Sequence, residues 1–470
     1  MTSSLSRALR VAALGLGLGS CAPPAGAGDP AIEPTVRALV PATDLDPDPR
    51  VVEIELEASP GVATLAEGVE TSVLAYRDGP TGVASVPGPL IEATVGDRLV
   101  VHFRNGLPAL RTTVHWHGLR LPVEMDGNPM VSGSVAPGEG FEYDFVLRDA
   151  GLHWYHPHVD TDVQLELGLQ GMLLVHEADP PVVDRERIFA LDDVSLDADG
   201  SIDVSLSADD AMLGRRGEVV TVNGGPPGTI VARPGSLERW RLVDTANGRY
   251  FAVVAEGLEV TVIGTDGGML AQPHAATRLL LAPGERLDLL VRMPEDSTTV
   301  PVRTEAFDRG LGHVDAAALL WTVEVDGEPV DTPMPELERT LAPLAEPAQT
   351  RRFEVSSRLE GPGEPVFFIN DERWPLNTPL EVVSGDVDAW EVVNDEDHHH
   401  PFHVHGLFFQ VLGPDGASLE QGWKDTIDVP PRSTIRLAVP YDEPGTWMFH
   451  CQIPEHAERG MMGDLVVAPR

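Results

Sequence analysis

From residue 50 onward, hydrophobic and polar residues alternate over short runs, and these runs follow no helical period. Val, Leu and Thr are frequent within the runs, while Gly, Pro, Asn and Asp separate one run from the next. Clear examples are the segments 51–56, 98–103, 142–147 and 435–439. Because successive side chains of a strand point to opposite faces, this alternation predicts strands with one buried face. Short strands divided by turn residues predict an all-β sandwich or barrel architecture.

Two sequence elements recur three times along the chain. The first element has a glycine turn, an alternating strand and a closing Asn, and it occurs as VGDRLVVHFRN (95–105), PGSLERWRLVDTAN (234–247) and SGDVDAWEVVN (384–394). The second occurs as APGEGFEYDFVL (136–147), APGERLDLLVRM (282–293) and PPRSTIRLAVP (430–440). Repetition at even spacing predicts three similar β domains, which we place at 50–178, 183–326 and 350–470. A segment rich in Pro and acidic residues, about 327–350, is expected to link the last two.

Length and charge agree with a multidomain protein and narrow the choice of partners. The 470 residues are too many for one compact core. Acidic residues outnumber basic ones by 74 to 33, which gives a formal net charge of −41. Such a surface repels nucleic acid and anionic lipid, so we expect no nucleic-acid partner.

The N-terminal segment resembles a bacterial lipoprotein signal. A basic start and an apolar run over 11–18 lead to Cys21, the residue that would be lipidated and become the mature N-terminus. An ordinary secretory signal cut near 25–27, or a chance match, would explain the same residues. We therefore expect a signal peptide at 1–21, export to the periplasm or cell surface, and membrane contact only through a lipid on Cys21. The Pro-, Gly- and Ala-rich stretch 22–49 is expected to be a flexible tether.

Histidines are concentrated in His-x-His pairs within the first and third repeats, and the middle repeat has no such pair. The complete pairs are His115 with His117, His156 with His158, and His403 with His405. Residues two apart on a strand point the same way, so each pair presents two imidazoles to one face. Pairs from two β domains could therefore enclose a cluster of metal ions between them.

The internal repeat identifies one missing histidine. Aligned on their glycines, DAGLHWYHPH and DEPGTWMFHCQ match His156 with His450 and His158 with Gln452. A pseudo-symmetric cage would need four complete pairs, and the fourth pair here is half filled.

A second metal site is predicted beside the cage. Cys451 lies between the two cage positions of its strand, so its side chain points to the opposite face. A thiolate with two imidazoles and a weakly bound methionine is the ligand set of blue copper. The candidate ligands are His400, Cys451, His456 and Met461. Adjacent backbone from His450 to Cys451 would give electrons a short covalent route between the two sites.

These motifs resemble those of the three-domain multicopper oxidases, such as laccases, bilirubin oxidases and bacterial copper oxidases, over about 50–470. The resemblance implies three consecutive cupredoxin-like Greek-key β-barrel or sandwich domains and up to four copper ions per chain. It implies that type 1 copper is held by the four candidate blue-copper ligands. By the same resemblance, type 2 copper would be bound by His115 and His403. One type 3 copper would be bound by His158, His405 and His450, and the other by His117, His156 and the residue at position 452.

The implied function is that of a laccase-like oxidase. Single electrons from a phenolic, aromatic or metal-ion reductant would enter at type 1 copper, and the cluster between domains 1 and 3 would reduce dioxygen to water. The family has His at position 452, whereas an amide oxygen is a harder and weaker donor for copper. Gln452 could ligate, or leave a two-histidine copper that still cycles. Alternatively that copper is lost, which leaves a slow oxidase or a copper-binding or electron-transfer lipoprotein; a third reading is a sequence error.

Reduction of dioxygen to water consumes protons, so acidic groups near the cluster are expected to take part. Asp126, nine residues after His117, matches a position that the family uses for this purpose, although a turn aspartate before glycine would have the same sequence. Some bacterial members carry an acid directly after the histidine matched by His456. This chain has Ala457 there, and Glu458 could substitute for the missing acid.

Further histidines lie beside these motifs. His398 and His399 precede His400 in an acidic loop, where they could attract metal ions or form a solvated polar loop. His153 is out of phase with the pair that follows it, so a structural or supporting role is expected.

Overall fold

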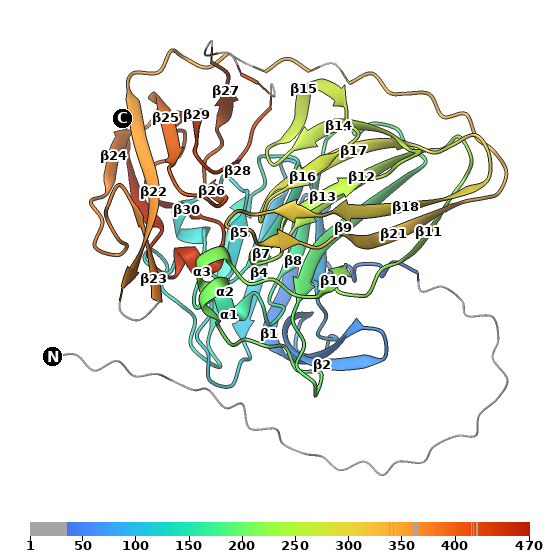
Figure 1. The fold of residues 1–470 in the computed structure, drawn as a ribbon, viewed down its shortest axis with the longest axis horizontal. Coiled ribbons are helices and arrows are strands. Elements are labelled where there is room, and N and C mark those ends of the chain that lie inside the picture. Colours follow the sequence, from blue (N-terminus) through green and yellow to red (C-terminus); the bar gives the residue numbers. More distant parts are fainter. Residues whose placement is uncertain are drawn as a thin grey trace. The chain divides into compact units, whose positions relative to one another are not determined.

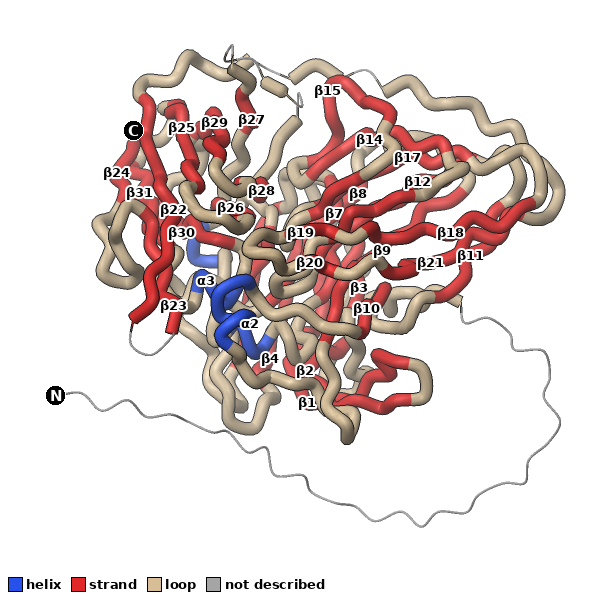
Figure 2. Tube along the Cα trace, in the orientation of Figure 1, coloured by secondary structure: helices blue, strands red, loops and turns tan. Residues whose placement is uncertain are grey.

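The structure is a computed structural model that describes residues 35–470 apart from 338, 342, 361–363, 415, 417, 420 and 421. The predicted signal peptide and the first part of the predicted tether, with Cys21, lie outside the described residues. Within the described part of the chain, no helix has the length and apolar character needed to cross a membrane. Strands dominate, and helix is confined to short segments (Figure 2).

The first of three strand groups forms two sheets, ordered β2-β1-β4-β6 and β3-β8-β7-β5 (Figure 1, blue to cyan). Its strands are β1 (Val51–Ala66), β2 (Val69–Asp78), β3 (Gly88–Thr94), β4 (Arg98–Asn105), β5 (His115–His117), β6 (Gly140–Val146), β7 (Gly151–His156) and β8 (Gly171–His176). A 3-10 helix (Val123–Met125) and α1 (Thr161–Gln164) lie in its loops.

The second group forms sheets ordered β10-β9-β12-β17-β14-β15 and β11-β21-β18-β13-β16, with β19 and β20 as a separate pair. Its strands are β9 (Arg185–Val194), β10 (Val219–Val222), β11 (Gly228–Ala232), β12 (Leu237–Asp244), β13 (Phe251–Val254), β14 (Glu259–Thr265), β15 (Gly268–Ala275), β16 (Leu279–Leu281), β17 (Arg286–Arg292), β18 (Thr298–Glu305), β19 (Phe307–Asp308), β20 (Val314–Asp315) and β21 (Ala318–Val325). Helix α2 (Ala208–Leu213) precedes β10 and begins with a capping box between Ser207 and Asp210.

The third group forms sheets ordered β23-β22-β25-β29-β27 and β24-β31-β30-β26-β28 (Figure 1, orange to red). Its strands are β22 (Thr350–Glu360), β23 (Glu364–Ile369), β24 (Leu380–Val383), β25 (Val387–Asn394), β26 (His400–Val404), β27 (Gln410–Leu412), β28 (Thr426–Val429), β29 (Ser433–Pro440), β30 (Gly445–Cys451) and β31 (Met462–Ala468). Helix α3 (Pro454–Ala457) connects β30 to β31 and carries His456.

The sequence repeat corresponds to a repeated strand arrangement. In each group, the strand of the first repeated element pairs in parallel with the group's opening strand and antiparallel with the strand of the second element. These central strands are β4 between β1 and β6, β12 between β9 and β17, and β25 between β22 and β29. The all-β prediction is therefore confirmed.

The alternation of hydrophobic and polar residues matches the alternation of buried and exposed side chains only in strands that have one face in solvent. In β6, Tyr143 and Phe145 are buried while their strand neighbours are not, as expected. In β12, every residue is buried, including Arg239 and Arg241. The outer face of β12 is covered because these arginines pair with acids that include Glu177 of the first group.

The hydrophobic core ties the first and third groups together. One buried cluster contains Trp116 and Tyr143 of the first group and Trp390 and Phe449 of the third. The second group has its own core around Trp240. The two groups that carry the His-x-His pairs therefore share one continuous apolar interior.

The flexible tether predicted up to residue 49 is wrong for its described part. Residues 35–49 run along the folded strands, where the Val36 N–H donates to Thr229 O (3.2 Å) and the Ala42 N–H donates to Leu90 O (2.7 Å). Composition suggested flexibility because the contacts are made by backbone groups and by single side chains such as Arg37, which donates to Gly224 O (2.6 Å), and these leave no repeating pattern in the sequence.

Candidate metal centre

Adjacent antiparallel strands bring the predicted pairs together. β5 pairs with β7 so that His115 lies opposite His156, and β26 pairs with β30 so that His403 lies opposite His450. His158, His405 and Gln452 follow the ends of these strands. The two strand pairs are equivalent in the repeat, as the internal alignment predicts.

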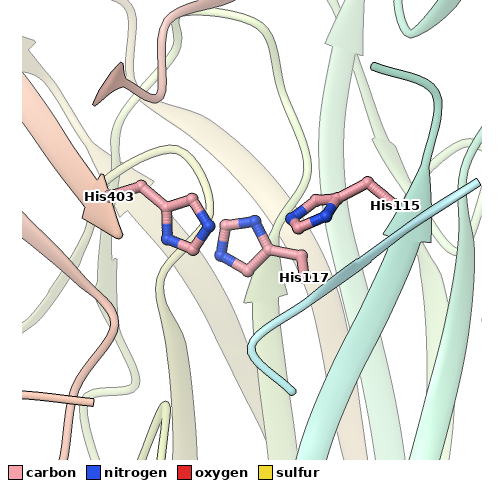
Figure 3. Close-up of side chains that lie close together, drawn as sticks. All are labelled: His115, His117 and His403. Carbon is pink, nitrogen blue, oxygen red and sulfur yellow. The ribbon is translucent and has the colours of Figure 1, made fainter. Parts of the chain in front are cut away.

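Imidazoles from the first and third groups interleave (Figure 3). The ring of His117 stacks on that of His403 with centroids 3.9 Å apart, and His115 stacks on His405 at the same distance. The ligating nitrogens of His115, His117 and His403 lie within 4.8 Å of one another. The predicted ligands of type 2 copper and of one type 3 copper are therefore neighbours.

A second set of nitrogens converges beside the first. The Nε2 atom of His450 lies 2.9 Å from that of His405 and 3.4 Å from that of His158. These are the three histidines that the resemblance assigned to one type 3 copper. All three are buried.

Three of the rings are oriented by a hydrogen bond from one nitrogen, and their other nitrogen has no hydrogen-bond partner. The Nδ1–H groups of His115, His403 and His156 donate to the backbone carbonyls of Asp126, Asp425 and Pro157, at 2.8, 3.0 and 2.9 Å respectively. Their Nε2 atoms are buried without a hydrogen-bond partner. Metal-ligating histidines in proteins are held in this way by their second nitrogen.

Burial favours the neutral form of His156, His158 and His450, because an apolar surrounding disfavours the charged imidazole. It lowers the pKa of His158 to about 3, and it lowers the pKa values of His156 and His450 well below the ordinary value. Neutral imidazole is the form that binds a metal ion.

The structure places Gln452 and His117 beside the same glycine, because a Cβ atom at Gly284 would lie 2.8 Å from Gln452 Cγ and 3.1 Å from His117 Cε1. Its Oε1 atom, the Nδ1 atom of His117 and the Nε2 atom of His156 are all buried and without a hydrogen-bond partner. The Gln452 backbone N–H donates to Pro401 O (2.7 Å), which fixes the start of its side chain. Each of the three residues predicted to hold the second type 3 copper therefore has one unsatisfied donor atom.

The predicted blue-copper ligands also converge. The Cys451 Sγ atom lies 3.4 Å from His456 Nδ1 and 3.8 Å from His400 Nδ1. Met461 is fully buried, and its carbonyl accepts the Cys451 N–H at 3.1 Å. Burial raises the pKa of the Cys451 thiol, so a bound cation is what would stabilise the thiolate.

Both type 1 histidines have their outer nitrogens engaged. The His456 Nε2–H donates to the Met212 carbonyl in α2 (3.0 Å), and the His400 Nε2–H donates to Glu396 (3.0 Å). Phe367 stacks on the His456 ring with centroids 4.1 Å apart. The helices α2 and α3 lie together in Figure 2, so α2 covers the His456 side of the site.

The two histidines before His400 do not form the solvated polar loop that was one of the two expectations for them. His398 is only 3% exposed, and its Nε2 atom lies 3.6 Å from Glu396. His399 donates from Nδ1 to Asp428 (2.8 Å) and packs against Phe307. The fold draws both histidines inward because the second group covers this loop, a contact that the local sequence does not indicate.

The two predicted acids occupy different positions. Asp126 accepts from the His405 Nδ1–H at 2.9 Å and pairs with His115 at 3.4 Å. Burial alone would raise its pKa, but these two histidines lower it below the ordinary value, so the carboxylate stays ionised. Glu458 accepts from the Thr161 N–H (2.9 Å), a few residues after the cluster histidine pair that ends β7.

Sequence reasoning missed the groups that hold His117 from outside the cluster. The His117 Nε2–H lies 3.2 Å from Asp425 Oδ1 and 3.1 Å from Thr426 Oγ1, and Asp425 in turn pairs with Arg286. No local pattern separates this aspartate from the many others in the chain. His153 is buried, with Nε2 3.3 Å from Asp149 O, as a supporting residue would be.

A buried thiol with two imidazoles, next to a cage of buried imidazoles, is a donor set suited to copper, because both groups favour soft or borderline cations. The first and third strand groups, which share one strand arrangement, carry these donors. The fold and the site together define a multidomain copper protein.

Comparison with known proteins agrees with this class. Sequence models described as multicopper oxidase match residues 68–180, 196–310 and 345–470. The chain is 30% identical over 422 residues to the multicopper oxidase MmcO of Mycobacterium tuberculosis, covering 80% of this chain and 81% of the relative. It is 27% identical over 403 residues to the multicopper oxidase mco of Staphylococcus epidermidis, covering 81% and 82%.

Solved structures give the same result. The multicopper oxidase of Campylobacter jejuni, described as a metallo-oxidase, superposes with a TM-score of 0.83 at 27% identity, covering 94% of this chain and 96% of that one. The multicopper oxidase of Pseudomonas thermotolerans superposes with a TM-score of 0.77 at 31% identity, covering 89% and 99%.

The chain belongs to the multicopper oxidase family. It is an oxidoreductase with cupredoxin-like domains that uses copper and couples oxidation of a reductant to reduction of dioxygen.

Proposed function

We propose that this multicopper oxidase is laccase-like and holds type 1 copper at His400, Cys451, His456 and Met461. We propose that the remaining predicted ligands, seven histidines and Gln452, hold a trinuclear cluster between the first and third groups. The observation that carries the proposal is that Cys451 and His450 are consecutive residues of β30 and belong to different donor sets.

Copper bound at these sites would supply one-electron redox chemistry, with reductant oxidised at type 1 and dioxygen reduced to water at the cluster. The protein provides the route and the orientation. Cys451 and His450 are joined by one peptide unit, and the Cys451 carbonyl accepts from the His450 Nδ1–H (2.8 Å), which aims Nε2 at the cluster. Electrons therefore have a covalent path between the sites.

Gln452 is proposed as a copper ligand through Oε1. Support comes from its burial and from the unpaired state of this atom and of the His117 and His156 nitrogens predicted to bind the same copper. Burial of the Gln452 amide oxygen without a partner destabilises the fold, and a bound cation would supply the missing partner. The competing function, an electron-transfer protein with an impaired cluster, would leave these donors without a role.

Asp126 and Glu458 are proposed to serve the proton supply. Asp126 contacts two cluster histidines directly and also orients them. Glu458 follows type 1 ligand His456 and accepts from Thr161, so it bridges the type 1 segment and the segment that carries His158. These contacts put both carboxylates next to segments that carry the cluster ligands.

A metal ion is the reductant that the type 1 surroundings favour. The Met212 carbonyl of helix α2 occupies the Nε2 edge of His456 and Phe367 stacks on the ring, which hinders contact of a phenol with this histidine. On the other side, Glu396 and His398 offer oxygen and nitrogen donors next to His400. A small cation such as Fe(II) or Cu(I) fits this edge better than a bulky aromatic molecule. The description of the Campylobacter relative as a metallo-oxidase supports the same substrate class.

The proposed function is tested by copper content and oxygen uptake in the full chain. We propose that the chain is exported and lipid-anchored at Cys21, so it is purified from the membrane fraction. About four copper ions per chain and oxygen uptake that depends on reductant are expected. One copper per chain with no oxygen uptake would support the electron-transfer alternative, and recovery only in the soluble fraction would contradict the anchor.

Replacing Glu396 by glutamine tests the substrate class. Loss of this charge should raise the KM for Fe(II) about tenfold, equivalent to about 1.4 kcal/mol of cation binding, and change the KM for a small aromatic amine much less. Steady-state oxygen uptake measures both. Asp397→Asn is the matched control, because Asp397 is an exposed neighbour that pairs with Arg432. An equal rise for both reductants would contradict a metal-ion site and indicate a change at His400 itself.

A further inference from the structure

The second strand group contributes no predicted copper ligand, yet one of its loops lies directly against the cluster. This loop, residues 282–286, joins β16 to β17 and ends at Arg286. Arg286 is 1% exposed. Its guanidinium reaches Asp425 of the third group, with Nη1 2.8 Å from Oδ1 and a second bond from Nη2 to Oδ2. Two parallel bonds of this kind fix both the distance and the plane of the carboxylate.

Asp425, whose carboxylate Arg286 holds, contacts two predicted ligands, one through its side chain and one through its backbone carbonyl. Asp425 Oδ1 lies 3.2 Å from His117 Nε2, and the Asp425 carbonyl accepts from the His403 Nδ1–H at 3.0 Å. Thr426 Oγ1 donates to Asp425 Oδ1 (2.8 Å) and lies within 3.1 Å of both rings. One segment thus sets the orientation of a predicted type 2 ligand and a predicted type 3 ligand.

Two glycines allow the loop and the guanidinium to approach this closely. A Cβ atom at Gly118, the residue after His117, would overlap the Arg286 guanidinium. A Cβ at Gly284 would lie 2.8 Å from Gln452 Cγ and 3.1 Å from His117 Cε1. Both glycines have positive φ, at 89° and 85°. The loop therefore packs against the His117 and Gln452 side chains as well as bonding through Arg286.

Further buried charged residues hold the Arg286–Asp425 ion pair in place. Asp266 of the second group accepts the Arg286 N–H (2.8 Å), and Lys424 pairs with Asp266 (3.1 Å) and Glu285 (3.2 Å). The charged groups of this network are almost fully buried. Salt therefore screens them little, and water cannot replace the guanidinium as the partner of the Asp425 carboxylate.

From this geometry we propose that the ligand-free middle domain acts as a positioning element for the cluster, with Arg286 as its key positioning residue. The inference rests on the proposed function, since it assumes that His117 and His403 hold copper. The side-chain hydrogen bonds of Arg286 go to Asp425 and to backbone carbonyls, so Arg286 acts on the ligands through Asp425.

The test is a copper titration of the metal-free full-length chain carrying Arg286→Lys, which keeps the charge and removes the bidentate geometry. Loss of a residue that hydrogen-bonds to a metal ligand lowers metal affinity roughly 10- to 100-fold. A loss of copper affinity of that size is expected for the type 2 site. The type 2 EPR signal should change, while the blue type 1 band keeps its intensity. Arg239→Lys is the matched control, because Arg239 is equally buried in the same domain and pairs with Glu177 and Asp288 away from the ligands.

Each outcome decides the inference. Unchanged cluster affinity and an unchanged type 2 signal in Arg286→Lys, with a fully loaded wild type, would overturn it while the proposed function stands. Equal losses in Arg239→Lys would also overturn it, since the effect would then be general destabilisation. If Arg286→Lys does not fold, Asp425→Asn probes the same contact from its other end, and normal type 2 affinity there would overturn the inference. A wild type that binds only type 1 copper would overturn both proposals.

Discussion

Cys451→Ser is expected to abolish the blue band, to remove one copper ion per chain, and to lower reductant-dependent oxygen uptake to the level of a buffer blank. A serine hydroxyl is a hard donor that stays protonated at neutral pH, so it cannot replace the thiolate in the type 1 site. The change also removes the side chain that begins the route to His450. Absorption spectroscopy, copper analysis and an oxygen electrode measure the three effects.

The cluster should survive this substitution. His450 is oriented by the backbone carbonyl of residue 451, not by its side chain. The type 2 EPR signal is therefore expected to persist, which separates loss of type 1 copper from unfolding. A blue band that persists in Cys451→Ser would contradict the type 1 assignment.

Gln452→Leu is expected to lose one copper ion per chain and most oxygen uptake, while Gln452→His should hold that copper more tightly than the wild type. Leucine has a similar volume and no donor atom. Removal of a direct ligand should cost more than the roughly 10- to 100-fold in affinity that loss of an outer partner costs. Histidine replaces an amide oxygen by an imidazole, the better donor for copper. Copper titration and oxygen uptake are compared across the three proteins.

Gln410→Leu is the control for this pair, since Gln410 is a buried glutamine in β27 of the same domain and is not among the predicted ligands. Retention of all copper and full oxygen uptake in Gln452→Leu would show that Gln452 does not ligate. In that case the second type 3 copper would depend on His117 and His156 alone. A histidine variant with no gain in affinity would show that the amide is not what limits the cluster.

Much of the fold and of both donor sets could be predicted because their signals are local. A strand alternates with period two, so spacing alone assigns each pair, such as His115 with His117, to one face of its strand. The same rule placed Cys451 on the face opposite His450. The threefold repeat fixed which histidines correspond, and it exposed position 452 as the one that differs.

Other features depend on residues that are far apart in the chain. The cover over His456 comes from Met212, and the support under His117 comes from Asp425 and Arg286. In the sequence, Arg286 follows Gly284 and Glu285 and resembles any exposed residue at the start of a strand. Only the packing of the second group against the third turns it into a buried partner, and no period or spacing in the sequence encodes that contact.

Taken alone, the sequence determined the all-β class, the repeat, the candidate ligands and the unusual glutamine, because strand period and internal repetition are properties of neighbouring residues. Tertiary structure decided which side chains orient those ligands, which edges of the type 1 histidines are covered, and that residues 35–49 belong to the folded body. These features arise where separate β groups pack together, and burial there follows from the shape of the assembled surfaces. The donors are a local property of the chain, and their orientation is a property of the whole fold.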